Sequence, residues 1–227
     1  MVNHQKKIYV YENWSATWPN KIGTLYVDVS KGKETFSFEY DSEWLKNSSF
    51  AFVLDPDLAM YNGRQFAPLD KAMLGKEDGA SAADGTSYLD LASFIKSNGG
   101  APEKDLKELW RRIVFNMAVS NTDDHLRNHG FILTPNGWCL SPLYDVNPVP
   151  YGDELSLNVS EEDPSISVEL AVETSEYYGF SKSEAEKEAQ NILAVVKDNW
   201  EKLAVKYGIS RSNMEYMHPA FGVCENV

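Results

Sequence analysis

The sequence predicts an α+β fold: a small β-rich amino-terminal module, then a mostly helical lobe that carries one β-hairpin. Three observations support this prediction. Apolar and polar residues alternate between residues 8 and 40, small and polar residues gather between residues 75 and 85, and apolar residues beyond them recur at helical spacing. We place the β-rich module at residues 1–68, a linker at residues 69–85 and the helical lobe at residues 86–227.

Composition narrows the class of protein. The chain has 227 residues, of which 34 are acidic and 21 basic, and its formal net charge is -13. A surface this negative repels phosphate backbones, so we expect no direct binding to nucleic acid. We expect no membrane association either, because no apolar run approaches the ~20 residues that span a bilayer. The two cysteines, Cys139 and Cys224, show no paired spacing, so a reducing cytoplasm is the expected location.

The predicted strands lie in the first module. Ile8 and Val10 alternate with tyrosines, and the same period of two recurs over residues 25–29 and 36–40. A short turn at residues 30–33 connects the last two segments, which predicts a hairpin. Trp44 and the next residue indicate one short helical turn.

Three helices are predicted in the second lobe. Ser87 is a suitable cap for a helix that ends near Gly99, and Pro102 suits the first turn of the next helix. Apolar residues form a helical stripe over residues 106–117. A capping box at residues 181–184 opens a third helix, which we expect Gly208 to stop.

The polar residues with the most chemical information surround a second predicted hairpin. Its strands, residues 131–133 and 138–140, flank a Pro-Asn-Gly turn. Asp123 and Asn128 stand five residues apart before the hairpin, and Asp145 follows it. When the hairpin folds back, its two ends meet, so Asp145 is expected near Asn128. Kinase-type phosphoryl transfer uses such a set: a base aspartate, an asparagine five residues later and a metal-binding aspartate.

Two other interpretations of these residues stay open at this point. Polar loop residues commonly cap a preceding helix and satisfy the loop backbone, without any catalytic role. His125 and His129, with acidic residues nearby, could also belong to a zinc hydrolase, although residues four apart at the entry to a strand do not share a helical face.

Several segments resemble HipA-family toxins, which are bacterial serine/threonine kinases of toxin–antitoxin modules. The resemblance is carried by residues 121–128 (NTDDHLRN) and 142–145 (PLYD), and extends to residues 87–90 (SYLD) and 109–116 (LWRRIVFN). In the first module it covers residues 22–25, 36–40 and 63–65. The resemblance implies that the helical lobe has the fold of a protein-kinase carboxyl lobe.

The resemblance also implies site residues. The catalytic base of the family falls on Asp123, and its magnesium ligands fall on Asn128 and Asp145. The positions implied for binding the cofactors, ATP and Mg²⁺, are His125, Arg127, Asn128, Tyr144 and Asp145. Asp124 falls where other members carry small residues, so no catalytic role is expected for it. A carboxylate there would raise the pKa of the base only if the two side chains faced each other.

One part of the HipA-family pattern has no counterpart in this sequence. In relatives, the loop that covers the phosphates, a lysine and the adenine-binding hinge lie between the first subdomain and the helical lobe. Here the two blocks follow each other near residues 68–69. Lys71 and Lys76 could substitute for the lysine, but solvated linker residues are the simpler interpretation. We therefore expect poor ATP binding and very slow or no phosphoryl transfer.

Two functions are compatible with this pattern. The first is a HipA-like kinase toxin, impaired by the missing loop and lysine, that transfers phosphate from ATP to a protein hydroxyl. The second is a non-catalytic protein, a truncated pseudokinase, that binds an antitoxin or an intact kinase. The resemblance implies a helix-turn-helix antitoxin of the HipB type as partner, and a substrate in translation, such as an aminoacyl-tRNA synthetase.

Overall fold

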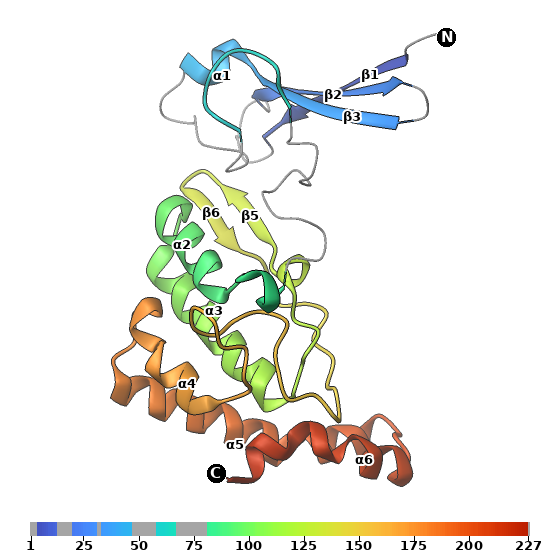
Figure 1. The fold of residues 1–227 in the computed structure, drawn as a ribbon, viewed down its shortest axis with the longest axis vertical. Coiled ribbons are helices and arrows are strands. Elements are labelled where there is room, and N and C mark those ends of the chain that lie inside the picture. Colours follow the sequence, from blue (N-terminus) through green and yellow to red (C-terminus); the bar gives the residue numbers. More distant parts are fainter. Residues whose placement is uncertain (1–3, 13–19, 31–32, 47–57, 67–80, 227) are drawn as a thin grey trace. The chain divides into compact units, whose positions relative to one another are not determined.

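The computed structural model describes residues 4–12, 20–30, 33–46, 58–66 and 81–226 (Figure 1). The chain divides into two compact units, unit 1 at residues 1–79 and unit 2 at residues 80–227. Most of the predicted linker, including Lys71 and Lys76, lies outside the described residues. The last part of that linker contains a short 3-10 helix, η1 (Ala82–Asp84).

The described residues of unit 1 form an antiparallel sheet and one short helix. Its strands follow the order β1 (His4–Tyr11), β2 (Lys21–Ser30), β3 (Lys33–Tyr40) and β4 (Gln65–Phe66). The predicted hairpin is confirmed, because Ser30 pairs with Lys33. The predicted helical turn is α1 (Ser42–Lys46). Among the described residues of this unit, the buried core cluster consists of Ile22, Phe38, Tyr40, Trp44 and Leu58.

Unit 2 is mainly helical and holds the second hairpin. The α-helices are α2 (Tyr88–Asn98), α3 (Pro102–Ala118), α4 (Val168–Glu173), α5 (Lys182–Lys206) and α6 (Arg211–Met217). Three further 3-10 helices are η2 (Leu126–Asn128), η3 (Ser175–Tyr178) and η4 (His218–Asn226). The hairpin strands are β5 (Phe131–Thr134) and β6 (Gly137–Leu140). The three helices and the hairpin predicted from the sequence are all present.

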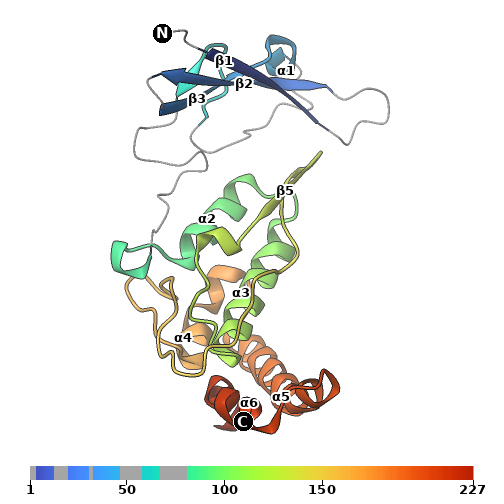
Figure 2. The ribbon, with the colours of Figure 1, turned by 90° about the vertical axis from the view of Figure 1, so that its right-hand side faces the viewer.

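Helix α3 is the central element of unit 2. It packs against α2 and β6 on one side and against α5 on the other (Figures 1 and 2). The predicted apolar stripe forms the core, in which Leu109, Trp110 and Val114 have no exposed surface. The Trp110 indole donates a hydrogen bond to the Ala171 carbonyl at 2.7 Å, which ties α3 to α4.

The predicted caps are present at the helix starts. The Ser87 hydroxyl accepts from the Leu89 amide at 3.1 Å, and the Asp90 carboxylate accepts from the Ser87 amide at 3.0 Å. The equivalent box opens α5, where the Glu184 carboxylate accepts from the Ser181 amide at 2.9 Å. These bonds satisfy amides that have no partner within a helix.

An irregular segment, residues 141–167, crosses unit 2 between β6 and α4 and was not predicted. It contributes Leu155, Leu157 and Val159 to the core, each at most 3% exposed. The Ser156 hydroxyl donates to the Thr122 carbonyl at 2.7 Å. The segment therefore supports the polar loop that contains the predicted site residues.

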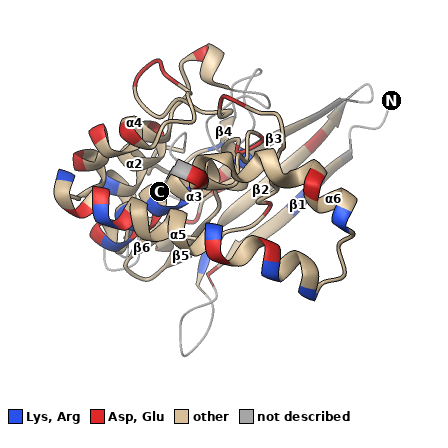
Figure 3. Cartoon of the chain, turned by 90° about the horizontal axis from the view of Figure 1, so that it is seen from below, with Lys and Arg blue, Asp and Glu red and all other residues tan. Residues whose placement is uncertain are grey.

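Charged residues of both signs are interspersed on α5 and α6 (Figure 3). Among the described residues, the helices lack the combination of length and apolar character that crossing a membrane requires.

Candidate functional site

The candidate site begins where α3 ends. Ser120 adopts a left-handed conformation with φ 47°, which is uncommon for a residue other than glycine. Its amide donates to the Met117 carbonyl at 3.1 Å, and the Asn121 amide donates to the Asn116 carbonyl at 2.8 Å. The chain thus reverses sharply after the helix and enters the polar loop, residues 121–130.

Asp123, the predicted base, lies on the outside of this loop. Its side chain is 75% exposed. Its backbone carbonyl accepts hydrogen bonds from the His125 amide at 3.0 Å and from the Asn128 carboxamide nitrogen at 3.1 Å. Asn128 is buried. The two residues that the sequence placed five apart are therefore linked directly, with the Asp123 carboxylate open to solvent.

The His125 side chain lies beside Asp123, and the Arg127 side chain lies beside His125. His125 Nε2 is 4.0 Å from the Asp123 carboxylate and 3.3 Å from an Arg127 guanidinium nitrogen. His125 Nδ1 is buried and forms no hydrogen bond within the described residues. The Arg127 guanidinium can neutralise negative charge, such as that of phosphate groups.

The β5–β6 hairpin returns the chain to the loop. Phe131 pairs with Leu140, and the Ser141 amide extends the ladder by donating to the Gly130 carbonyl at 2.8 Å. The Tyr144 hydroxyl then donates to the Arg127 carbonyl at 2.6 Å. Residues 141–144 therefore lie beside residues 127–130.

Two buried side chains of α3 anchor the hairpin end. The Arg112 guanidinium donates to the Ser141 carbonyl at 2.7 Å, and the Asp105 carboxylate accepts from the Leu140 amide at 2.9 Å. Neither anchor was predicted from the sequence. The sequence offers no signal for them, because charged residues on an amphipathic helix usually face solvent.

Asp145, the second predicted metal ligand, follows Tyr144 in a left-handed conformation with φ 55°. Its side chain is exposed and accepts a hydrogen bond from the Asn147 carboxamide at 2.9 Å. Aspartate tolerates this conformation better than most residues, at a cost of about 1 kcal/mol. Asp145 and Ser120 thus provide two left-handed non-glycine residues on the segments that border the loop.

Asp124 points in the opposite direction from its neighbour. It is 1% exposed and lies in the interior of unit 2. One carboxylate is exposed and the other is buried, so the two adjacent carboxylates do not face each other. His129 is also buried, and its Nε2 lies 3.1 Å from the Asp124 carboxylate.

The zinc-hydrolase interpretation gains no support from this geometry. His129 is used internally, while His125 lies at the outer side of the loop. In the part of the chain that the structure describes, no three His, Cys, Asp or Glu side chains gather closely enough to hold a metal ion.

The donor atoms fit Mg²⁺ better than zinc. The Asn128 carboxamide and the Asp145 carboxylate offer oxygen, the ligand type that Mg²⁺ prefers, and Mg²⁺ commonly binds one or two carboxylates together with substrate phosphates. A site of this kind is completed by a nucleotide rather than by further side chains. Asn128 and Asp145 are therefore the residues whose donor atoms would suit Mg²⁺.

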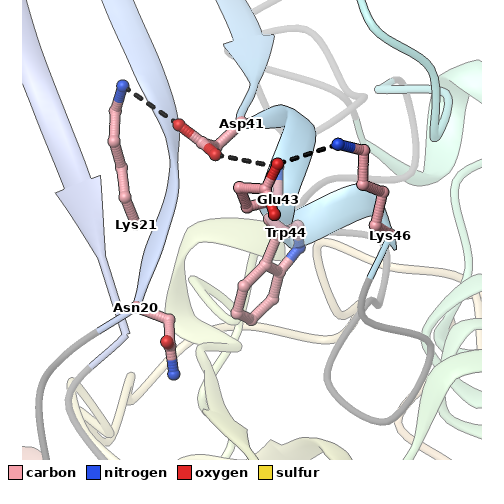
Figure 4. Close-up of a pocket in the computed structure, with 6 residues that line it drawn as sticks. All are labelled: Asn20, Lys21, Asp41, Glu43, Trp44 and Lys46. Carbon is pink, nitrogen blue, oxygen red and sulfur yellow. Dashed lines mark hydrogen bonds and ion pairs between the residues drawn. The ribbon is translucent and has the colours of Figure 1, made fainter.

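Unit 1 contains a separate cavity of about 490 Å³ (Figure 4). Its charged lining residues are mutually paired: Lys21 lies 3.3 Å from Asp41, and Lys46 lies 2.8 Å from Glu43. Trp44 forms the apolar part of the lining. Because the charges neutralise each other, this cavity offers no reactive set comparable with that around Asp123.

Comparison with known proteins gives three findings. The HipA-like C-terminal domain family matches residues 68–200, which include every predicted site residue. A Haemophilus influenzae protein named "Putative kinase" is 36% identical over 76 residues, which are 32% of this chain and 22% of that protein. The fold resembles a chain from the complex of the Shewanella oneidensis MR-1 toxin–antitoxin system HipA, HipB and operator DNA, with a TM-score of 0.55 and 14% identity.

The structural match covers 98% of this chain and 63% of the Shewanella chain. The chain therefore spans less than two thirds of the length of either relative.

Proposed function

The chain belongs to the HipA family through its HipA-like C-terminal domain, and we propose that unit 2 is the catalytic and metal-binding half of a HipA-type protein serine/threonine kinase. The observation that carries this proposal is the convergence of two segments. Residues 127–130 and 141–144 are joined by two hydrogen bonds, and the exposed Asp123 and Asp145 flank them. The convergence supports the proposal, because kinase-type phosphoryl transfer uses a base aspartate and metal-binding side chains from neighbouring segments of the carboxyl lobe.

Each residue has a distinct role in the proposed reaction. Asp123 accepts the proton of the substrate hydroxyl, for which its exposed carboxylate is accessible. Asn128 and Asp145 would hold Mg²⁺, which supplies charge neutralisation for the phosphates when bound. Arg127 adds positive charge to the loop, and its guanidinium lies 3.3 Å from Nε2 of His125, which is itself 4.0 Å from the Asp123 carboxylate. Tyr144 keeps the Asp145 segment beside Arg127.

The proposal includes a low affinity for ATP. The sequence has no counterpart of the phosphate-covering loop, lysine and hinge between its two HipA-like blocks. Positioning and charge neutralisation supply most of the rate of phosphoryl transfer. A carboxyl lobe alone therefore transfers phosphate very slowly or not at all.

Calorimetric titration with ATP and Mg²⁺ tests the proposed low affinity for ATP. We expect a dissociation constant of about 1 mM or weaker, corresponding to roughly -4 kcal/mol or less in magnitude. Micromolar binding would show that an unrecognised segment replaces the missing one.

Incubation with radiolabelled ATP tests the proposed slow phosphoryl transfer and the assignment of Asp123 as its base. Any transfer should disappear in Asp123→Asn and in Asp145→Asn. It should persist in Asp198→Asn, which changes an exposed carboxylate on α5. Transfer that survives Asp123→Asn would contradict the assignment of the base.

A second candidate function is binding of an antitoxin of the HipB type without catalysis. Two observations favour it: the similar Shewanella chain comes from a complex with HipB, and the net charge of -13 suits a basic partner. Co-purification with such an antitoxin, equal for the wild-type chain and Asp123→Asn and independent of ATP, is the expected result. Antitoxin binding that requires ATP would argue against this candidate.

A further inference from the structure

The polar loop rests on a buried carboxylate that the proposed chemistry does not use. Asp124 is 1% exposed, and its Oδ2 accepts hydrogen bonds from three side chains. Tyr88 donates through its hydroxyl at 2.6 Å, Asn116 through its carboxamide at 2.5 Å and His129 through Nε2 at 3.1 Å. Tyr88 opens α2 and Asn116 lies in the last turn of α3, so this carboxylate ties the loop to two helices.

The side chains around Asp124 are also hydrogen-bonded to one another or held as donors to it. The Asn116 carboxamide oxygen accepts from the Asn121 carboxamide at 3.1 Å, and both asparagines have no exposed surface. Burial, together with the Asp124 charge, raises the pKa of Tyr88, which keeps its phenol protonated as a donor. A buried carboxylate is tolerated when it is hydrogen-bonded in this way.

The network repeats the spacing of the site residues. Asp124 directly follows Asp123 in the sequence, and His129 directly follows Asn128. Asp124 and His129 are hydrogen-bonded to each other in the protein interior. Asp123 and Asn128, one position earlier, are bonded on the outer side through the Asp123 carbonyl. Two parallel links, each spanning five residues, thus define the loop. The buried link fixes the span between the proposed base and the proposed metal ligand.

We propose that Asp124 and His129 are positioning residues, whose buried hydrogen bond holds Asp123 and Asn128 at the separation that the reaction and the metal require. This inference rests on the proposed function. Its physical basis is preorganisation, because functional side chains act efficiently only when neighbouring groups fix their geometry. Groups that orient a metal ligand typically change metal affinity by tenfold or more when they are replaced.

Metal binding is tested with Mn²⁺, a paramagnetic substitute for Mg²⁺. It is added to the full chain, labelled for NMR. In the wild-type chain, Mn²⁺ should selectively broaden the amide signals of residues 123–128 and 144–146. In Asp124→Asn, which keeps the side-chain size, about tenfold more Mn²⁺ should be needed for the same broadening. Tyr178→Phe is the matched control. Tyr178 is buried, as Asp124 is, but its hydroxyl has no partner within the described residues.

Amide hydrogen exchange separates this inference from the proposed function. We expect residues 124–129 to exchange about tenfold faster in Asp124→Asn, with α5 unchanged. Asp145→Asn should abolish the Mn²⁺ broadening without altering that exchange. If Mn²⁺ broadens nothing in the wild-type chain, the metal site of the proposed function fails, and the claim that Asp124 positions Asn128 for a metal fails with it. The exchange rates then decide whether the buried bond holds the loop.

The inference is overturned if folded Asp124→Asn keeps both the wild-type exchange rates and the wild-type Mn²⁺ broadening. If Asp124→Asn does not fold, Tyr88→Phe takes its place, because it removes only one of the three donors. Intermediate changes in both measurements support the inference, and wild-type values in both overturn it.

Discussion

At the scale of single residues, exposure gives two adjacent aspartates different roles. The Asp123 side chain is 75% exposed, whereas that of Asp124 is 2% exposed. A solvated carboxylate can approach a substrate, while a buried one must keep its hydrogen bonds. The two residues are chemically identical, so their environments alone make one a candidate base and the other a support.

Two buried tyrosines test the importance of the Asp124 network for stability. Tyr88→Phe removes a hydrogen bond to a carboxylate and should lower the free energy of unfolding by about 1.5–3 kcal/mol. Tyr178→Phe removes a hydroxyl that has no partner within the described residues, so its effect should stay within about 0.5 kcal/mol. Urea unfolding of both variants measures the difference. Equal losses would show that the network contributes little.

The same tyrosines predict how stability depends on pH. Burial raises the pKa of Tyr88 and of Tyr178 above the ordinary 10.0, and raises that of the Cys224 thiol from 9.0 to about 11. The unfolded chain therefore loses these protons at a lower pH than the folded chain. The stabilisation that these three groups contribute is fully present below about pH 8. It is lost as the pH rises, by up to about 1.4 kcal/mol per pH unit for each group.

Urea unfolding at several pH values between about 8 and 11 should show this decline in the free energy of unfolding. Tyr178→Phe should make the decline above about pH 10 shallower. A free energy of unfolding that stays constant over the whole range would contradict the prediction.

At the scale of elements, the β5–β6 hairpin determines where Asp145 lies. Its turn is seated against the end of α2, where the Gly100 amide donates to the Trp138 carbonyl at 2.8 Å. Its other end is held by Arg112 and Asp105 of α3. The hairpin therefore acts as a rigid connection between the loop of Asp123 and the segment of Asp145.

Gly137 is the glycine on which this seating depends. Its φ is 123°, and a Cβ atom there would lie 2.8 Å from the Asn98 carbonyl oxygen and 2.9 Å from the Gly100 nitrogen. Both neighbours are backbone atoms that cannot move aside easily. Gly137→Ala should therefore lower the free energy of unfolding by about 2–4 kcal/mol, through backbone strain together with overpacking.

Gly208→Ala is the matched control for Gly137→Ala. Gly208 also has a positive φ, 74°, but its Cβ would meet nothing within 4 Å. Gly208→Ala should lower the free energy of unfolding only through backbone strain, by about 1 kcal/mol. Thermal unfolding of the two variants gives the comparison, and similar losses would contradict the close packing of Gly137 against α2.

At the scale of the whole molecule, the two units differ in the cores that their described residues form. In the described part of unit 1, five buried apolar residues form one cluster, whereas the main cluster of unit 2 contains residues from α2, α3, α4 and α5. A small domain with a single modest core has little stability to spare. Unit 1 should therefore be the more sensitive of the two to core substitutions.

Phe38→Ala tests this difference. Phe38 is 1% exposed, and its truncation should cost about 3–5 kcal/mol, enough to unfold unit 1. The helical circular dichroism signal of unit 2 should remain. Phe36→Ala, on the same strand but 41% exposed, is the control and should leave both units folded. Loss of the helical signal in Phe38→Ala would show that the units do not fold independently.

Much of the fold could be predicted from the sequence because local signals agreed with the final packing. The alternation in β1–β3, the cap at Ser87 and the capping box at Ser181 each correspond to an observed element. Strand β4, helix α4 and the buried segment at residues 155–159 carried no such signal, because tertiary contacts rather than periodicity determine them. The roles of the site residues stay predictions, although the hairpin brings their segments together.

By itself, the sequence determined the family, the α+β architecture and the order Asp123, Asn128, hairpin, Asp145. These depend on residue identity and spacing, which a linear chain displays directly. Only the tertiary structure decided that Asp124 is buried beneath Asp123, that His129 closes the buried link and that α3 anchors the hairpin. Those contacts join residues from separate elements. Burial and hydrogen-bond partners are properties of the packed interior, which no local pattern encodes.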